Sequence, residues 1–138
     1  MAGDRPLGEK ELADFVQEWF DRMSRHDPVG EMLPFVADSD LEMAFPERTL
    51  RSHDDFRDWY AVVGEAFADQ THVVEKAVGR AEGDGVAVDV TVVWTAKSVA
   101  DGTVSSFRVQ QKWRLAYPSD TGRPVIVSYL VGDLTPIV

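Results

Sequence analysis

The second half of the chain has the pattern of consecutive β-strands, and this feature limits the possible folds more than any other. Between residues 107 and 115, apolar positions and one glutamine alternate with charged or amide side chains. That period of two is typical of a strand with one buried face. Gly-Asp-Gly at 83–85 and Asp-Gly at 101–102 are turn signals. The pattern predicts antiparallel strands over residues 71–81, 86–96, 107–115 and 125–131, with a loop over 118–124 and a final stop at Gly132-Asp133.

The first half has helical periodicity instead. Apolar residues recur every three or four positions from Leu12 to Met23, which predicts an amphipathic helix that ends before Asp27-Pro28. A short second helix is expected from Val29 to Val36, and a short strand over residues 41–45. Ser52 has the character of a helix N-cap, and the helix behind it should bury four aromatic residues and a valine. They are Phe56, Trp59, Tyr60, Val63 and Phe67.

This order of elements predicts an α+β fold in a single domain covering residues 1–138. Helices packed on one face of a curved antiparallel sheet enclose a pocket, and polar groups inside it are candidates for chemistry or ligand recognition. Asp89 lies out of step with its apolar strand neighbours, so we expect it on the outer face. Residues 86–96 are otherwise apolar on both faces, which favours a homodimer through the outer face of the sheet.

Composition narrows the class of protein further. The chain has no cysteine, which excludes disulfides and thiolate metal sites and fits a cytoplasmic protein. Its formal net charge is −10, from 24 acidic and 14 basic residues, so nucleic acid and anionic membrane surfaces are not expected partners. We find no secretion signal and no apolar stretch long enough to span a membrane. The histidines have no metal-site spacing, so no metal is predicted.

Three polar residues are expected to face inward from the strands. His72 is the candidate general acid or base, because an imidazole exchanges protons near neutral pH. Tyr129 could polarise a ligand oxygen, and Gln111 offers an amide donor and acceptor within an apolar row. Three aromatic residues are expected to line the same pocket as substrate-binding residues: Trp19, Tyr60 and Trp113. His26 and His53, near helix ends, are expected at the surface.

The chain resembles the nuclear transport factor 2-like superfamily, which includes SnoaL-type polyketide cyclases, ketosteroid isomerase, scytalone dehydratase and limonene epoxide hydrolase. The resemblance covers residues 11–134 and rests on element order and on four local patterns: ELADFVQEWFDRMSRHDP, FVADSDLEMAFP, QTHVVEKAVGRAEGDGVAVDVTVVW and QQKWRLAYP. It implies a cystatin-like roll, a cone in which a curved antiparallel sheet wraps on three N-terminal helices.

Individual positions match the relatives unevenly. Residues 43–45 lack the aspartate base that ketosteroid isomerases place late in the first strand, and the arginine of the epoxide hydrolases is missing beside Asp89. His72 matches the histidine that enters the second strand of scytalone dehydratase, although that enzyme's tyrosines correspond to Met23 and Phe45. The resemblance therefore leaves one credible proton-transfer residue.

Together these observations predict a pocket protein for a small hydrophobic molecule. One hypothesis is a cofactor-independent cyclase, dehydratase or isomerase that uses His72 as general acid or base. Alternatives are a non-catalytic ligand-binding protein, or a structural subunit resembling the small subunit of ring-hydroxylating dioxygenases.

Overall fold

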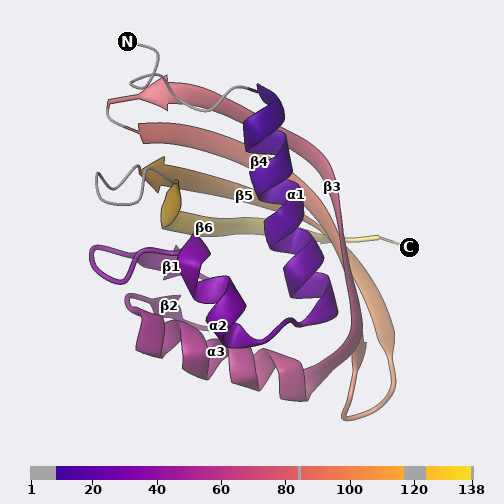
Figure 1. The fold of residues 1–138 in the computed structure, drawn as a ribbon. Helices are drawn as coiled ribbons and strands as arrows, with labels where there is room; N and C mark the ends of the chain where they lie inside the picture. The colour runs from indigo at the N-terminus through magenta and orange to yellow at the C-terminus, as the bar shows by residue number, and fades with distance from the viewer. Residues whose placement is uncertain (1–8, 84, 117–123, 138) are drawn as a thin grey trace.

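A six-stranded sheet packed against helices forms the molecule (Figure 1). The computed structural model describes residues 9–83, 85–116 and 124–137. The helical elements are α1 (Glu9–Arg25), α2 (Val29–Met32), the 3-10 turn η2 (Leu33–Phe35) and α3 (His53–Ala66). The strands are β1 (Glu42–Ala44), β2 (Thr49–Leu50), β3 (Phe67–Glu82), β4 (Gly85–Ser98), β5 (Val104–Ala116) and β6 (Val125–Pro136).

The strand order in the sheet is β2-β1-β6-β5-β4-β3. The four long strands pair antiparallel with their neighbours, whereas β1 pairs with β6 in parallel. Figure 1 shows the long strands curving around α1, which crosses the concave side of the sheet, while α3 lies along one end. The predicted α+β class, with three N-terminal helices on a curved sheet, is confirmed.

The helix signals in the sequence are confirmed by their caps. The Ser52 side chain accepts a hydrogen bond from the backbone N–H of Asp55, which satisfies one unpaired donor at the start of α3. At the end of α1, His26 has a φ of 52°, and its N–H donates to the carbonyl of Met23. His26 thus occupies the left-handed position that usually ends a helix with glycine.

Several predicted boundaries are wrong. Strand β3 begins at Phe67, not at residue 71, because a bulge at Asp69 (φ 52°) lets the strand start directly after α3. Strand β6 continues past Gly132 to Pro136, with a register shift where an earlier stop was expected. Strand β2 was not predicted at all. Asp84 of the expected turn and residues 118–123 of the expected loop lie outside the described residues.

Because side chains alternate along each strand, the sheet has one buried apolar face and one polar face exposed to solvent. Positions 86, 88, 90 and 92 of β4 are buried in the core under the helices. Asp89 points outward, as predicted, and forms ion pairs with Lys112 (3.3 Å) and Arg80 (3.6 Å). Another ion pair on this face joins Arg108 to Glu75 at 2.7 Å. The outer face is therefore more polar than the sequence of β4 indicated, and a homodimer through it stays a prediction.

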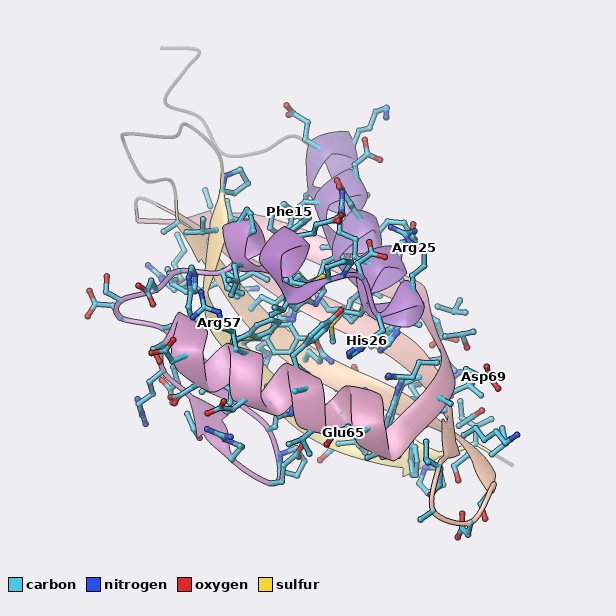
Figure 2. The ribbon with its side chains drawn as sticks, turned by 60° about the horizontal axis from the view of Figure 1, so that its bottom comes forward. Phe15, Arg25, His26, Arg57, Glu65 and Asp69 are labelled. Atoms are coloured by element: carbon cyan, nitrogen blue, oxygen red, sulfur yellow. The ribbon has the colours of Figure 1, made fainter. Side chains whose placement is uncertain are left out.

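His26 and His53 are half-buried, so the expectation that both lie at the surface is wrong. The His53 Nε2 lies 2.8 Å from the carbonyl oxygen of Val36. The ring of His26 stacks on Tyr60 with centroids 4.0 Å apart, and Figure 2 places His26 between the end of α1 and α3. Gly64 of α3 packs against the same imidazole, since a Cβ there would lie 2.4 Å from its Nε2.

We expect Gly64→Ala to lower the free energy of unfolding by about 1–3 kcal/mol, because the added methyl group must displace a ring held between neighbours. The measurement is urea unfolding followed by circular dichroism. Gly30→Ala in α2 is the matched control, since no atom lies within 4 Å of its added Cβ. Alanine's better helix propensity should make that variant neutral or up to ~1 kcal/mol more stable. Equal effects at the two glycines would contradict the packing argument.

Candidate functional site

A cavity of about 510 Å³ lies on the concave side of the sheet. Its wall is mostly apolar and aromatic, with Phe20 and Met23 contributed by α1 and Trp94 by β4. The volume falls within the range of small-molecule sites, roughly 300–1,000 Å³. Five polar side chains also line it: Glu47, Gln70, His72, Gln111 and Tyr129.

His72 is held on the cavity wall by contacts on two sides. Its position on β3 lies opposite Trp94 on β4, and its ring stacks on Phe20 with centroids 5.4 Å apart. The Nδ1 atom lies 3.0 Å from the hydroxyl oxygen of Ser24, near the end of α1. Within the described parts of the chain, Nε2 has no hydrogen-bond partner, so this nitrogen is available to a molecule in the cavity.

Burial of His72 lowers the pKa of its imidazole to about 4. Part of the His72 side chain remains accessible to solvent, because its ring faces the cavity. Protein atoms nevertheless replace most of the water around the ring. Removing water penalises the charged form, and no carboxylate among the described residues bonds to the ring to offset this. The imidazole is therefore neutral at physiological pH and can act as a base or as a hydrogen-bonding group.

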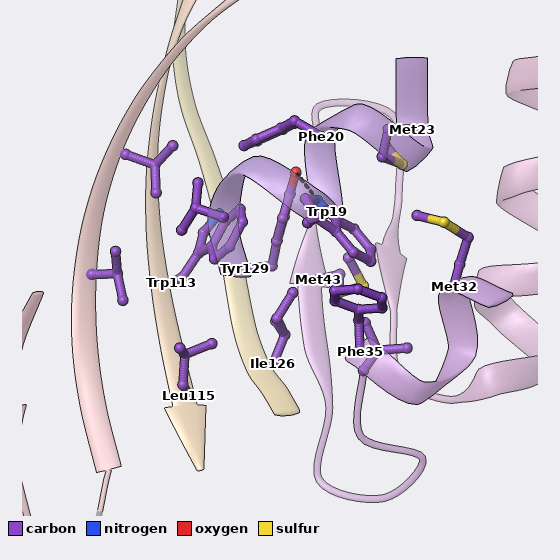
Figure 3. Close-up of a cluster of buried hydrophobic side chains, with 14 of the residues drawn as sticks. Trp19, Phe20, Met23, Met32, Phe35, Met43, Trp113, Leu115, Ile126 and Tyr129 are labelled. Carbon is purple, nitrogen blue, oxygen red and sulfur yellow. Dashed lines mark hydrogen bonds between the residues drawn. The ribbon is translucent and has the colours of Figure 1, made fainter. Parts of the chain in front are cut away.

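Tyr129 and Gln111 lie on adjoining strands. Tyr129 lies opposite Trp113 across β5 and β6, and it is almost completely buried (Figure 3). Its hydroxyl accepts a hydrogen bond from Nε1 of Trp19 at 3.4 Å. Burial raises the pKa of the Tyr129 phenol well above its ordinary value, and hydrogen bonds from Trp19 and Gln111 offset part of that rise. The phenol is consequently a neutral donor, unsuited to act as a base.

Of the six predicted site residues, the structure brings three to the cavity wall and leaves three behind it. His72, Gln111 and Tyr129 line the cavity. Trp19, Tyr60 and Trp113 are not among its lining residues. The two tryptophans lie one layer back and donate hydrogen bonds to Tyr129 and Gln111. Tyr60 instead donates to the carbonyl oxygen of Asp27 at 2.5 Å, and burial raises its pKa to about 12.

Three residues at or behind the cavity were not anticipated. Gln70 faces inward two positions before His72, and the strand parity would have found it had the strand been extended past the bulge. Ser24 lies one helical turn after Phe20, on the side of α1 that meets β3. Glu47 lies in the connection after β1, and it accepts a hydrogen bond from Trp59 at 3.1 Å. No sequence pattern marks a loop residue of that kind.

The described residues contain no cluster of three or more histidine or acidic side chains that could hold a metal ion. Over the same parts of the chain, no helix has the length and apolar character needed to cross a bilayer.

The arrangement of the helices on this sheet is the nuclear transport factor 2-like fold. A sequence profile described as the SnoaL-like domain matches residues 16–123, and the chain belongs to that family. No curated protein sequence matches the chain significantly.

Solved structures show the same fold at low sequence identity. A candidate scytalone dehydratase from Novosphingobium aromaticivorans has a TM-score of 0.79 at 10% identity, covering 94% of this chain and 87% of its own. Hexachlorocyclohexane dehydrochlorinase LinA-type3 from Novosphingobium barchaimii has a TM-score of 0.78 at 12% identity, covering 92% and 88%. A ketosteroid isomerase-like protein from Erwinia carotovora atroseptica has a TM-score of 0.74 at 20% identity, covering 95% and 99%. These similarities establish the fold and leave the reaction open.

Because the pKa of His72 is lowered in the folded protein, we expect the free energy of unfolding to fall as the pH falls. Between pH 6.5 and about 4, the unfolded chain binds a proton at His72 that the folded protein does not. The stability that the neutral imidazole contributes to the folded protein is therefore complete above pH 6.5 and is lost as the pH falls towards 4. We expect wild type to lose about 2–3 kcal/mol more of its unfolding free energy over that window than His72→Phe. Urea unfolding at closely spaced pH values measures the difference.

His26 also has a lowered pKa through burial, so both proteins share its contribution and only the difference between them reports on His72. Parallel pH curves for wild type and His72→Phe would show that the imidazole of His72 is not desolvated in solution.

Proposed function

We propose that this protein is a cofactor-independent enzyme that moves a proton on a small hydrophobic, oxygenated molecule, in a cyclisation, dehydration or isomerisation. The observation that carries the proposal is the environment of His72: an apolar cavity, a fixed Nδ1 and an Nε2 that has no hydrogen-bond partner among the described residues. When Nδ1 carries the proton and donates to Ser24, the lone pair of Nε2 is directed away from that bond and is free to accept a substrate proton.

The proposed step is removal of a proton from a carbon next to a carbonyl group. The C–H electron pair forms a C=C bond, the carbonyl oxygen takes the negative charge, and Nε2 of His72 takes the proton. Neutral donors stabilise such an oxyanion in a site with little water. The phenol of Tyr129 and the amide of Gln111 supply such donors on the neighbouring strands. Return of the proton to another atom completes an isomerisation, and loss of hydroxide completes a dehydration.

Proteins of this fold include, by name, a dehydratase, a dehydrochlorinase and an isomerase-like protein. Reactions of these kinds begin with removal of a proton, which supports the proposed step for this chain. Within one fold, the side chains in the cavity decide which reaction takes place.

One observation favours a second candidate, a non-catalytic ligand-binding protein. Catalytic bases work best when their pKa lies near the operating pH, whereas the pKa of His72 falls to about 4 and its partner is a neutral serine. In this alternative, His72 is only a hydrogen-bond acceptor for the ligand.

Proton exchange separates the two candidates. The methyl protons of 4-acetylbiphenyl, an apolar ketone, are followed by NMR in D₂O with and without protein. The enzyme is expected to accelerate exchange for deuterium at these positions, since exchange needs only the first proton transfer. Binding of the ketone without acceleration would support the ligand-binding protein and contradict the proposed enzyme.

Native mass spectrometry of the purified protein would also detect a co-purified ligand and would report the oligomeric state.

A further inference from the structure

Every tryptophan of this chain donates its indole N–H to a polar side chain that lines the cavity. The chain has four tryptophans. The four hydrogen bonds run from Trp19 to Tyr129 (3.4 Å), Trp59 to Glu47 (3.1 Å), Trp94 to Gln70 (3.0 Å) and Trp113 to Gln111 (2.8 Å). All four acceptors belong to the cavity wall. The arrangement fixes which atoms of these polar groups remain available to a ligand.

The two glutamines are affected most. An indole N–H can only donate, so the atom that meets it must be the amide oxygen, and the amide cannot be turned by half a rotation without placing two donors face to face. Gln70 and Gln111 are each only 8% exposed, so water does not readily replace the lost bond. Trp94 and Trp113 therefore each occupy one lone pair of a glutamine oxygen and fix the orientation of its amide, and the NH₂ groups are left as donors.

The hydroxyl of Tyr129 follows the same logic. Its oxygen accepts a hydrogen bond from Trp19. The hydroxyl proton then remains to be donated. The cavity wall thus presents donors from Gln70, Gln111 and Tyr129, while Nε2 of His72 is its inward acceptor when Nδ1 donates to Ser24. Glu47 adds a carboxylate only at the exposed rim.

The amides of Gln70 and Gln111 come from different levels of the sheet. Gln111 pairs with Val90 on β4, whereas Gln70 precedes Thr71, which pairs with Thr95. Five residues of β4 separate the two levels, roughly 17 Å along a straight strand. The concave curvature of the sheet shortens this span on the cavity side (Figure 1). Because the two amides come from different levels of the sheet, the two ends of an elongated ligand can meet one amide each.

We infer that the cavity selects an elongated apolar molecule with a hydrogen-bond-accepting oxygen, such as a ketone or ester carbonyl, near each end. Gln70 and Gln111 are the specificity-determining residues, and Trp94 and Trp113 are the positioning residues that turn their NH₂ groups towards the ligand. The inference rests on the proposed use of this cavity as a ligand site, and it adds the substrate class.

Three biphenyls of matched size test the inference: 4,4′-diacetylbiphenyl, 4-acetyl-4′-ethylbiphenyl and 4,4′-diethylbiphenyl, which carry two, one and no carbonyl groups. Equilibrium dialysis measures their affinities. Wild type is expected to bind the diacetyl compound about tenfold more tightly than the diethyl compound, with the mixed compound between them. Equal affinities, or no binding of the diacetyl compound, would overturn the inference.

Gln70→Met and Gln111→Met remove the amide donors without adding charge or changing size greatly. Each is expected to reduce the diacetyl-to-diethyl affinity ratio about threefold or more. Gln110→Met is the matched control, because Gln110 adjoins Gln111 but bonds Thr91 on the outer face, and it should keep the wild-type ratio. Trp94→Phe provides a second route if the Gln70 variant does not fold: it frees the Gln70 amide to rotate and should also lower the ratio.

The affinity ratio is measured without proton transfer, so it and the proton-exchange rate are independent measurements. A retained ratio without proton exchange in wild type would overturn the proposed enzyme alone. A ratio near one in wild type, with proton exchange intact, would overturn the selection for two acceptor oxygens alone. A ratio unchanged in Gln70→Met, Gln111→Met and Trp94→Phe would remove these residues as its cause.

Discussion

Replacing His72 by asparagine is expected to slow catalysed proton exchange by about 10²–10⁴-fold, the usual contribution of a positioned general base. The asparagine amide can still donate to Ser24 from a position close to that of Nδ1, so the wall of the cavity should keep its shape. What is lost is the nitrogen that faces the cavity. NMR in D₂O with a saturating ketone probe measures the rate, and equilibrium dialysis shows whether the probe still binds.

The pH dependence distinguishes a desolvated histidine from an ordinary one. Because the pKa of His72 is lowered to about 4, the basic form persists as the pH falls from 7 to 5, and the rate of the free enzyme should decline only as the pH approaches 4. An unperturbed imidazole would cause the decline near pH 6.5. His53→Gln is the control, since its amide can still reach the carbonyl of Val36, outside the cavity. Full activity in His72→Asn would show that another group is the base.

Replacing Trp19 by alanine is expected to lower the free energy of unfolding by about 3–5 kcal/mol, the largest stability effect that we predict. The side chain is completely buried in the cluster shown in Figure 3. Its ring lies 5.7 Å from that of Phe35, 6.0 Å from that of Phe56 and 5.9 Å from that of Tyr129. Truncation leaves a void between α1 and the sheet, and the Tyr129 hydroxyl loses a donor. Urea unfolding measures the change.

Two further variants separate the causes of that loss. Trp19→Phe keeps an aromatic ring but removes the N–H, so it should cost less than the alanine variant. Val62→Ala on α3 is the surface control, because Val62 is 60% exposed and its truncation should change stability by less than ~0.5 kcal/mol. A loss below 1 kcal/mol in Trp19→Ala would contradict the packing of α1 on this sheet.

The sequence predicted the parts of the fold that depend on local pattern. The alternation in β5 placed Gln111 inward and its neighbours outward, and the parity of β4 placed Asp89 on the outer face. The same parity argument placed His72 and Tyr129 on the concave side, where the structure has them on the cavity wall. The start of β3 was missed because a bulge breaks the period of two at Asp69, and Gln70 was missed with it.

The sequence could not divide the aromatic residues between the cavity wall and the layer behind it. Trp19, Trp59, Trp94 and Trp113 all have the apolar neighbours of core residues. Only Trp59 and Trp94 reach the cavity surface, and neither was among the expected site residues. That division depends on how α1 and α3 lie across the sheet, and periodicity within one element carries no information about it.

The sequence by itself determined the class of fold, the inward direction of the polar residues on the strands and the absence of cysteine chemistry. These follow from side-chain periodicity and composition, which are local properties. The tertiary structure alone decided that Ser24 fixes the imidazole of His72. It alone also decided that each indole N–H donates a hydrogen bond to an oxygen of a polar side chain on the cavity wall. These contacts join residues up to 110 positions apart. They arise only when the sheet curves around α1 and buried polar groups must find partners away from water.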